Sequence, residues 1–331
     1  MGMAALCVIA TRCAAADLPL AFALNRAIDG PAAPFVLPFD RGYYKAEGLN
    51  VGIETLASSQ DTIERVASGN ADMGVADLNA LIRYRDSNPK TPVKAVFVLY
   101  NRPPFAVTGR RSRGIATPKD LEGKRVGVPA AGATAAQWPI FLKEAGLDAG
   151  KIAVEPVSIP VREPMLAAGQ IDAITGQSLQ VAIGLRERGV PANDIVVMLM
   201  ADHGLALYGD AIIVSTAFAE RRPAAVKGFL RAFVKGLQDS VASPAAAVAS
   251  VLKRNDGANK DTEIERLMMA IRDNIVTAEV KENGVGGVDG ARFARAIDQI
   301  AAAASFREAK PKLEEIFDAS FLPAPAERRA F

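Results

Sequence analysis

Few residues in this chain could carry out covalent or metal chemistry. Histidine occurs once, as His203, and the two cysteines, Cys7 and Cys13, both lie in the first thirteen residues. A multi-histidine metal site is therefore impossible, and no Cys-x-x-Cys pair exists for zinc or redox chemistry. We expect no metal, no cofactor and no catalytic residue, and we predict that the chain is not an enzyme.

Polar residues that could bind a ligand recur where strands are predicted to end. In open parallel sheets, ligands bind beyond the carboxyl ends of the strands, where N–H groups of the next helix point at them. This rule, together with the aromatic residues near the same loops, predicts these ligand-binding residues: Asn25, Asp77, Asn101, Gly132, Thr134, Trp138, Gln177, Tyr208 and Asp210.

Several of these residues also have a purely structural interpretation. Asp77 and Thr134 could cap the helices that follow them by accepting backbone N–H bonds. Asn101 lies in a proline-rich turn and could serve turn formation alone. Trp138 precedes a proline, so a helix begins or kinks there, and an aromatic ring near such a loop more often belongs to the core. The sequence leaves these alternatives open.

Short strands alternate with amphipathic helices from Asp17 to Tyr208, which favours α/β layers with largely parallel sheets. We expect strands at residues 18–24, 49–55, 73–76, 93–100, 125–128, 153–156, 171–175, 195–200 and 211–214. The helices between them are expected at 34–45, 61–67, 78–85, 135–145, 163–168 and 179–188. Beyond residue 214 the apolar spacing predicts helices at 223–241, 262–275, 290–306 and 312–321.

One segment occurs twice in similar form. ERVASGNAD at Glu64–Asp72 resembles EPMLAAGQID at Glu163–Asp172. In both, a helix ends at a glycine and an aspartate opens a buried strand three residues later. Gly69 and Gly169 suit the left-handed position that follows a helix. The repeat fits either a duplicated lobe or the helix–glycine–strand order common to all α/β folds.

Length and charge restrict the class of protein. The 331 residues predict about two domains. The chain has 39 Lys and Arg against 37 Asp and Glu with no basic block, so we expect no nucleic-acid partner. Residues 1–16 resemble a truncated export signal, because alanines 14 and 16 fit a cleavage site although the positive segment is missing. A cytoplasmic tail is the alternative.

Five runs follow one another along the chain. They are RGYYKAEGLNV (41–51), VASGNADMGV (66–75), DLEGKRVGV (120–128), AGQIDA (168–173) and YGDAIIV (208–214). In this order they resemble the nitrate/sulfonate/taurine family of ABC-transporter solute-binding proteins. That group includes proteins that bind pyrimidine precursors of thiamine.

The resemblance implies a type II periplasmic-binding-protein fold, an α/β fold in which two lobes with mainly parallel sheets are joined by two crossing strands. The first lobe would comprise residues 17–108 and 208–331 with the C-terminal helices, and the second lobe residues 109–207. The crossings would lie near residues 105–108 and 208–214. The predicted site residues would then face one another across the cleft between the lobes.

The function implied by the resemblance is capture of a small solute in the periplasm by hinge closure, and its delivery to the membrane permease of an ABC importer. We expect a monomer that binds a sulfonate, another small anion or a heteroaromatic. We expect Arg102 to be the cation nearest to the predicted cleft residues, and Asp77 and Asp210 are acids. This departs from a simple anion binder and leaves room for a neutral or amine-bearing heteroaromatic.

Two other functions remain as alternatives. The first is a pyrimidine-precursor synthase-like enzyme of the same fold. The resemblance implies a cysteine cluster and an essential histidine in such enzymes, and this chain has no cysteine after Cys13. The second is the effector domain of a transcription regulator, which we do not expect, because it needs a DNA-binding helix pair ahead of the lobes and sixteen residues are too few to form one.

Overall fold

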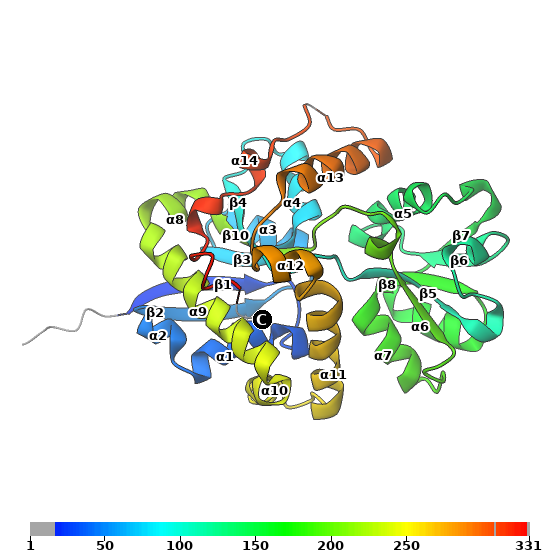
Figure 1. The fold of residues 1–331 in the computed structure, drawn as a ribbon, viewed down its shortest axis with the longest axis horizontal. Helices are drawn as coiled ribbons and strands as arrows, with labels where there is room; N and C mark the ends of the chain where they lie inside the picture. Colours follow the sequence, from blue (N-terminus) through cyan, green and yellow to red (C-terminus); the bar gives the residue numbers. More distant parts are fainter. Residues whose placement is uncertain (1–16, 308, 330–331) are drawn as a thin grey trace, which may run out of the picture.

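The computed structural model describes residues 17–307 and 309–329. Within them, ten strands form two five-stranded sheets, one in each of two lobes (Figure 1). The export signal expected at residues 1–16 lies outside the described residues.

The first sheet lies in the lobe that contains both the first and the last described residues. Its strand order is β2 (Leu49–Thr55), β1 (Leu18–Leu24), β3 (Met73–Asp77), β10 (Asp210–Ser215) and β4 (Val93–Val98). β1 pairs in parallel with β2 and β3, whereas β10 runs antiparallel to β3 and β4. β10 therefore enters the sheet as the single antiparallel strand.

The second sheet repeats this topology. Its strand order is β7 (Ala153–Pro156), β6 (Arg125–Val128), β8 (Ala173–Gln177), β5 (Phe105–Arg110) and β9 (Ile195–Leu199). β6 pairs in parallel with β7 and β8, and β5 is antiparallel to β8 and β9. The two lobes thus have the predicted α/β architecture of two lobes with mainly parallel sheets.

The repeated sequence segment has the same role in both lobes. Gly69 and Gly169 both have positive φ angles, 74° and 73°. A carboxylate oxygen of Asp72 accepts the N–H of Ala21 in β1 at 2.9 Å. Asp172 accepts the N–H of Arg125 in β6 at the same distance. The shared topology and the shared contacts favour a duplicated lobe over a chance recurrence.

The boundary between the lobes differs from the expected one. Residues 105–108 were expected to form a crossing strand that closes the first lobe. They belong instead to β5, which pairs along its whole length with β8 and β9 of the second sheet. The chain therefore changes lobes before Phe105, in the segment between β4 and β5, and returns in the segment between β9 and β10.

Helices cover both faces of the first sheet (Figure 1). One face packs on α1 (Ala33–Asp40), α2 (Tyr43–Ala46) and α9 (Pro223–Ala242), and the other on α3 (Ser59–Ala67), α4 (Leu78–Ser87) and α13 (Gly290–Ala303). Alternate residues of a strand point to opposite faces, and Ile212 and Ile213 of β10 accordingly belong to different apolar clusters.

Phenylalanines dominate the core beneath α9. The ring of Phe22 in β1 stacks on Phe229 of α9 with centroids 4.7 Å apart. Phe35 in α1 lies 4.6 Å from Phe233, one turn further along α9. The helical stripe that the sequence predicts at 223–241 therefore faces the sheet, and its phenylalanines are fully buried.

The remaining helices of the first lobe are α8 (Thr216–Arg221), α10 (Pro244–Leu252), α11 (Lys260–Ala270), α12 (Ala278–Asn283) and α14 (Leu313–Ile316). The second lobe contains α5 (Ala133–Glu144), α6 (Ile159–Ala168) and α7 (Ser178–Glu187). In Figure 1, α13 lies beside α5 and α11 beside α7, so helices of both lobes meet on two sides.

Several predicted helices differ from the observed ones, and three of them differ in kind. The helix expected at 34–45 is divided between α1 and α2, because Gly42 takes a φ of +70°. The stripe expected at 262–275 ends its α-helix at Ala270 and continues as a wider π-turn, and Met268 is 53% exposed rather than in the core. The helix expected at 312–321 is a single turn, after which Phe317 pairs with the edge strand β4 at Ala95.

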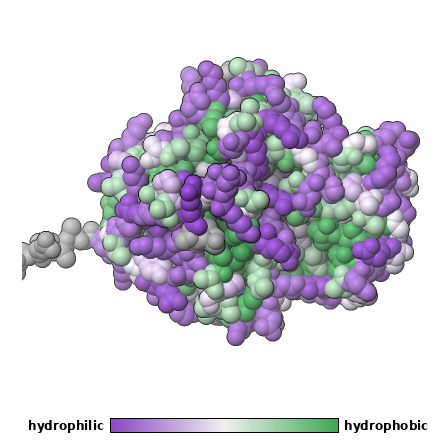
Figure 2. Space-filling model, viewed as in Figure 1, coloured by the Kyte–Doolittle hydropathy of each residue, from purple (hydrophilic) through white to green (hydrophobic). Residues whose placement is uncertain are grey.

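On the face of the molecule seen in Figure 2, hydrophilic side chains predominate, and apolar side chains gather in patches on both lobes. Among the described residues, the most exposed large apolar side chains include Ile159, at 60%. No helix in the described part of the chain combines the length and apolar character needed to cross a membrane.

Candidate functional site

A cavity of about 730 Å³ lies between the two lobes. Strand ends, helix N-termini and turns of both lobes form its wall, as the strand-end rule predicts for α/β sheets. Its volume lies in the range of small-molecule sites, roughly 300–1,000 Å³. Of the predicted site residues, six line it: Asn25, Asp77, Gly132, Thr134, Gln177 and Asp210.

The first lobe contributes two carboxylates on neighbouring strands. Asp77 ends β3 and Asp210 begins β10, and the two are paired directly across the antiparallel ladder. Both are buried, with exposed fractions of 3% and 6%. Asn25, at the end of β1, donates to Asp210 Oδ1 at 3.1 Å and to Ser59 Oγ at 3.1 Å. These side chains form the acidic floor of the cavity.

Asp77 has both of the roles that the sequence left open. Its Oδ1 accepts the N–H of Ala80 at 2.9 Å and so caps α4, while the residue also lines the cavity. Burial, and then the nearby Asp210 carboxylate, raises the pKa of Asp77 to about 7. Asp77 therefore caps α4 and lines the cleft at the same time.

Asp210 is neutralised by an arginine that the sequence reading did not select. Arg26 binds the carboxylate of Asp210, and its Nη1 donates to Tyr100 Oη at 3.2 Å. Arg26 directly follows Asn25, so the strand-end rule points to its loop without singling it out. Ser59 begins α3 shortly after β2, and the same rule could have found it there.

The second lobe contributes the N-terminus of α5. Gly132 precedes the helix with a φ of +96°, and no side chain caps it. Thr134 therefore does not cap its helix, and both residues lie in the wall of the cavity. Gln177 ends β8 and also lines the cavity without capping α7. The backbone N–H groups at the start of α5 remain available to a bound molecule.

Two further polar residues of this lobe were missed. Gln137 lies one turn beyond Thr134 on the same face of α5, a position that helical spacing could have revealed. Arg162 lies in α6, which begins four residues earlier than expected, at Ile159. Its Nε donates to Glu163 at 2.9 Å, and its side chain is almost fully buried.

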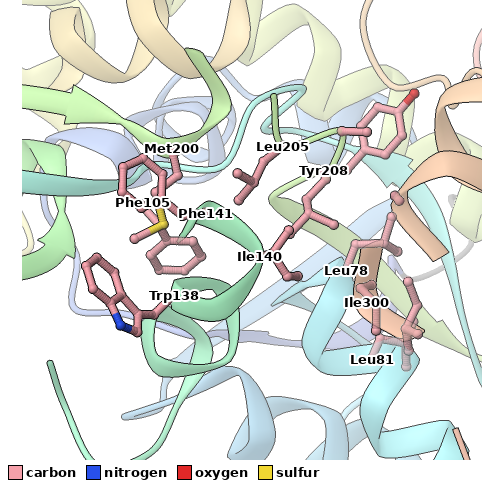
Figure 3. Packing of buried hydrophobic residues seen from close by; sticks show 14 of the residues in the cluster. Leu78, Leu81, Phe105, Trp138, Ile140, Phe141, Met200, Leu205, Tyr208 and Ile300 are labelled. Carbon is pink, nitrogen blue, oxygen red and sulfur yellow. The ribbon is translucent and has the colours of Figure 1, made fainter. Parts of the chain in front are cut away.

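Trp138 does not line the cavity. Figure 3 shows its ring packed near Phe141, Met200 and Phe105 in the apolar interior. Its centroid lies 5.8 Å from that of Phe141 in a stacked arrangement. Trp138 was predicted to face the cleft, but its ring lies in the apolar core and not in the cavity wall. His203 packs edge-on against the same Phe141, also outside the cavity wall.

Asn101 and Tyr208 also lie outside the cavity wall, in the two segments that join the lobes. Arg292 of α13 donates from Nη2 to the carbonyl oxygens of Asn101 at 2.6 Å and Leu207 at 2.7 Å. Its guanidinium also lies 4.0 Å from the centre of the Tyr208 ring. Arg292 therefore clamps both crossing segments together. The sequence could not show this, because the clamp comes from a helix more than 80 residues away.

No group of three or more potential metal ligands occurs within the described residues. The residues that line the cavity make it a polar cleft with carboxylates, carboxamides and a free helix N-terminus. This set of groups can bind a small polar molecule through hydrogen bonds from both lobes.

Three similar proteins are named for riboflavin or for pyrimidine compounds. The riboflavin-binding protein RibY of Chloroflexus aurantiacus is 26% identical over 301 residues, covering 88% of this chain and 82% of RibY. A formylaminopyrimidine-binding protein of Halalkalibacterium halodurans is 25% identical over 66% of each chain. A 4-amino-5-hydroxymethyl-2-methylpyrimidine phosphate synthase of Aspergillus parasiticus is 26% identical, covering 65% of this chain and 64% of the synthase.

Solved structures share the fold at lower identity. The periplasmic aliphatic sulphonate binding protein SsuA of Escherichia coli superposes with a TM-score of 0.69 at 13% identity, covering 90% of this chain and 96% of SsuA. The nitrate-binding protein NrtA of Synechocystis has a TM-score of 0.66 at 12% identity, covering 92% and 86%. The periplasmic-binding-protein fold is thereby confirmed.

A family model described as NMT1/THI5 like matches residues 31–247. The matched segment includes every strand of both sheets except β1, together with all the predicted site residues except Asn25. Because it covers well over half of the chain, this protein belongs to the NMT1/THI5-like family.

Proposed function

We propose that this protein is the solute-binding component of an ABC importer, which captures a small organic solute between its lobes and passes it to a membrane permease. The observation that carries the proposal is the cavity of about 730 Å³, to which both lobes contribute polar side chains. Closure of two lobes around such a cavity excludes water and strengthens each polar contact.

The composition of the cavity wall favours binding over catalysis. Among the described residues that line it, none is a histidine or a cysteine. The named relatives include both binding proteins and a synthase, so the synthase-like enzyme remains the competing function. Turnover of a bound pyrimidine compound by the purified protein would favour that alternative.

We further propose that the protein acts in the periplasm as a monomer. The similarity to periplasmic SsuA supports this location, as does the resemblance of residues 1–16 to an export signal. Fractionation of cells that express the full chain should place it in the periplasm. Size-exclusion chromatography with light scattering should give the mass of one chain, 34.9 kDa or less after signal removal.

A thermal-shift screen tests the binding function. The panel contains flavins, pyrimidines, small sulfonates, nitrate and aromatic acids. A compound that binds only the folded state raises the melting temperature by mass action, by the equivalent of about 2.7 kcal/mol at a hundredfold excess over Kd. We expect at least one compound to do so. No shift across the panel, with protein shown to be folded by circular dichroism, would contradict the proposal.

A variant with a blocked cleft gives the control. Ala136 is an exposed residue of α5 that lines the cavity, so Ala136→Trp should place an indole in the cleft and abolish the shift. Ala224→Trp makes the same change on an exposed turn of α9, outside the cavity wall, and should preserve the shift. Equal responses of the two variants would show that the compound binds elsewhere.

A further inference from the structure

Gln137 is a buried carboxamide without partners. Its exposed fraction is 2%, and neither Nε2 nor Oε1 has a hydrogen-bond partner among the described residues. Other buried side chains in the described residues also have an unpaired polar atom, but of these only Gln137 lines the cavity. Since burial of an unpaired carboxamide costs free energy, a bound molecule that pairs with it gains the full benefit of both hydrogen bonds.

The residues beside Gln137 determine which part of a solute its carboxamide could contact. It lies on the face of α5 that also places Ala133, Ala136 and Ile140 in the cavity wall. Those neighbours are apolar, so a ring that lies against them would be held by dispersion contacts while Gln137 pairs with its polar edge. The wall of the second lobe is thus suited to a flat ring with polar groups at one edge.

Asp77 presents an acceptor from the other lobe. Its carboxylate accepts from Ala80 N at 2.9 Å and from Asn79 Nδ2 at 3.3 Å, and no ion pair to it is formed within the described residues. Arg26, which follows Asn25 at the end of β1, is bound to Asp210. A carboxyl group that lacks a cation is best matched by an N–H donor.

The cations of the cavity wall are already bound to the protein. Arg83 donates to the carbonyl oxygens of Ile300 and Ala304, both at 2.9 Å. Arg162 is paired with Glu163 at 2.9 Å. An anion in the cavity would therefore face Asp77 without an unengaged arginine, and only the N–H groups at the start of α5 would meet its charge. Such a wall favours a solute without a strong negative charge over sulfonates and nitrate.

We propose that the solute is a heterocycle without a strong anionic group, that Gln137 pairs with an edge where a ring N–H adjoins a carbonyl, and that Asp77 accepts a second N–H. A carboxamide presents one donor and one acceptor side by side, which matches such a cyclic amide or imide edge. This assignment rests on the proposed solute-binding function and names the class of solute and the residue that selects it.

The test compares compounds that differ only at the polar edge. Riboflavin and uracil carry an imide N–H, and their 3-methyl derivatives lack it; methanesulfonate and nitrate serve as anions. Calorimetric titration of the full chain should show at least one imide bound about tenfold or more tightly than its 3-methyl derivative, the ratio expected for one lost hydrogen bond that leaves a buried partner unpaired.

Gln137→Leu isolates the residue. Leucine has a similar size and no polar atoms, so the variant should fold with a melting temperature equal to or above that of the unmodified protein. It should bind the imide and its 3-methyl derivative with the same affinity. Gln170→Leu, at an exposed position of the same lobe outside the cavity, should keep the tenfold preference.

The outcomes separate the two proposals. If Gln137→Leu retains the preference for the imide, the role of Gln137 is refuted. If the unmodified protein binds methanesulfonate or nitrate and neither pair of heterocycles, the class of solute is refuted while the solute-binding function stands. If no compound of the full screening panel binds to folded protein, both proposals are refuted.

Discussion

At the scale of single residues, the candidate site is defined by how each charge is compensated. Asp210 has Arg26 and Asn25 as partners, whereas Asp77 has only N–H groups of its own helix and of Asn79. Two carboxylates side by side on adjacent strands repel each other, so the group without a cation holds its proton more tightly. This difference has a measurable consequence for stability.

Asp77→Asn should stabilise the free protein at alkaline pH. The pKa of Asp77 is raised to about 7 in the folded state, chiefly by burial. A raised carboxyl pKa means that the folded state binds the proton more tightly, so stability falls as pH rises from about 4 to about 7. Asparagine keeps the helix cap and carries no charge. Urea unfolding should show the variant more stable by about 4 kcal/mol at pH 8 and equal near pH 4.

The control for this change is Asp289→Asn, which alters another N-cap aspartate. Asp289 accepts the N–H of Arg292 at 2.7 Å and lies outside the cavity wall. Its variant should follow the pH profile of the unmodified protein. Parallel profiles for Asp77→Asn and the unmodified protein would contradict the unusual protonation of Asp77.

The strand-end rule found part of the site and missed the rest for a physical reason. Asn25, Asp77 and Gln177 could be placed in the cleft because a strand end fixes where its next residue lies. Asn101 and Tyr208 follow the same pattern, but Arg292 and Glu279 bind them at the junction of the lobes. Those partners are distant in sequence, so local patterns carry no sign of them.

At the scale of elements, local signals were reliable where apolar alternation and flanking turn residues agree on the bounds of a strand. The strands at 18–24, 49–55, 125–128 and 153–156 have the bounds predicted from alternation and turn residues. Residues 312–321 were predicted as a helix, but edge strand β4 offers free hydrogen bonds. Asp318 N donates to Ala95 O there at 2.9 Å. A tertiary partner outweighed helix propensity at that point.

The two equivalent glycines should differ in their response to substitution. Gly69→Ala places a Cβ in open space at a positive φ, so the expected cost is about 1 kcal/mol. Gly169→Ala adds a clash with the guanidinium of Arg113, which donates to Gly169 O at 3.2 Å. Loss of that bond should bring the cost to about 2 kcal/mol, measured by urea unfolding.

Two further variants check this comparison. In an Arg113→Ala background, Gly169→Ala should cost about 1 kcal/mol, as Gly69→Ala does in the unmodified protein. Gly290→Ala changes a glycine in the first turn of α13, where φ is not positive and a Cβ meets nothing, and should be neutral or slightly stabilising. Equal costs at positions 69 and 169 would exclude a role for Arg113.

At the scale of the whole molecule, the lobes touch through helices as well as through the crossing segments. Arg186 of α7 donates to Glu265 of α11 at 2.6 Å, which joins the second lobe to the first. Arg295 of α13 binds Glu144 of α5 at 3.5 Å on the other side. These contacts form only when the lobes are close, so they favour the closed arrangement before any solute arrives.

Arg186→Ala should therefore weaken solute binding without reshaping the site. Both partners are partly exposed, so the pair is worth roughly 0.2–1 kcal/mol, and the affinity should fall at most about fivefold. The radius of gyration of the free protein in X-ray scattering should rise. Glu265→Ala should have the same effect, and the double variant should be no worse than either single one.

The matched control is Lys310→Ala, which breaks an exposed ion pair with Asp298 within the first lobe. Its affinity for the solute and its radius of gyration should equal those of the unmodified protein. If Lys310→Ala and Arg186→Ala have equal effects, the contact between α7 and α11 does not influence closure.

The path of the chain between the sheets has a last consequence. Gly209 N donates to Tyr100 O at 2.9 Å, and Leu99 and Tyr100 both donate to Asp210 O, so the points where the chain leaves and re-enters the first lobe are adjacent. The second sheet is built entirely from the uninterrupted stretch 105–199, whereas the first is assembled from two separated stretches. A single continuous segment of the gene therefore encodes the second lobe. One recombination event that exchanges this segment between relatives would replace every cleft residue that the second lobe contributes.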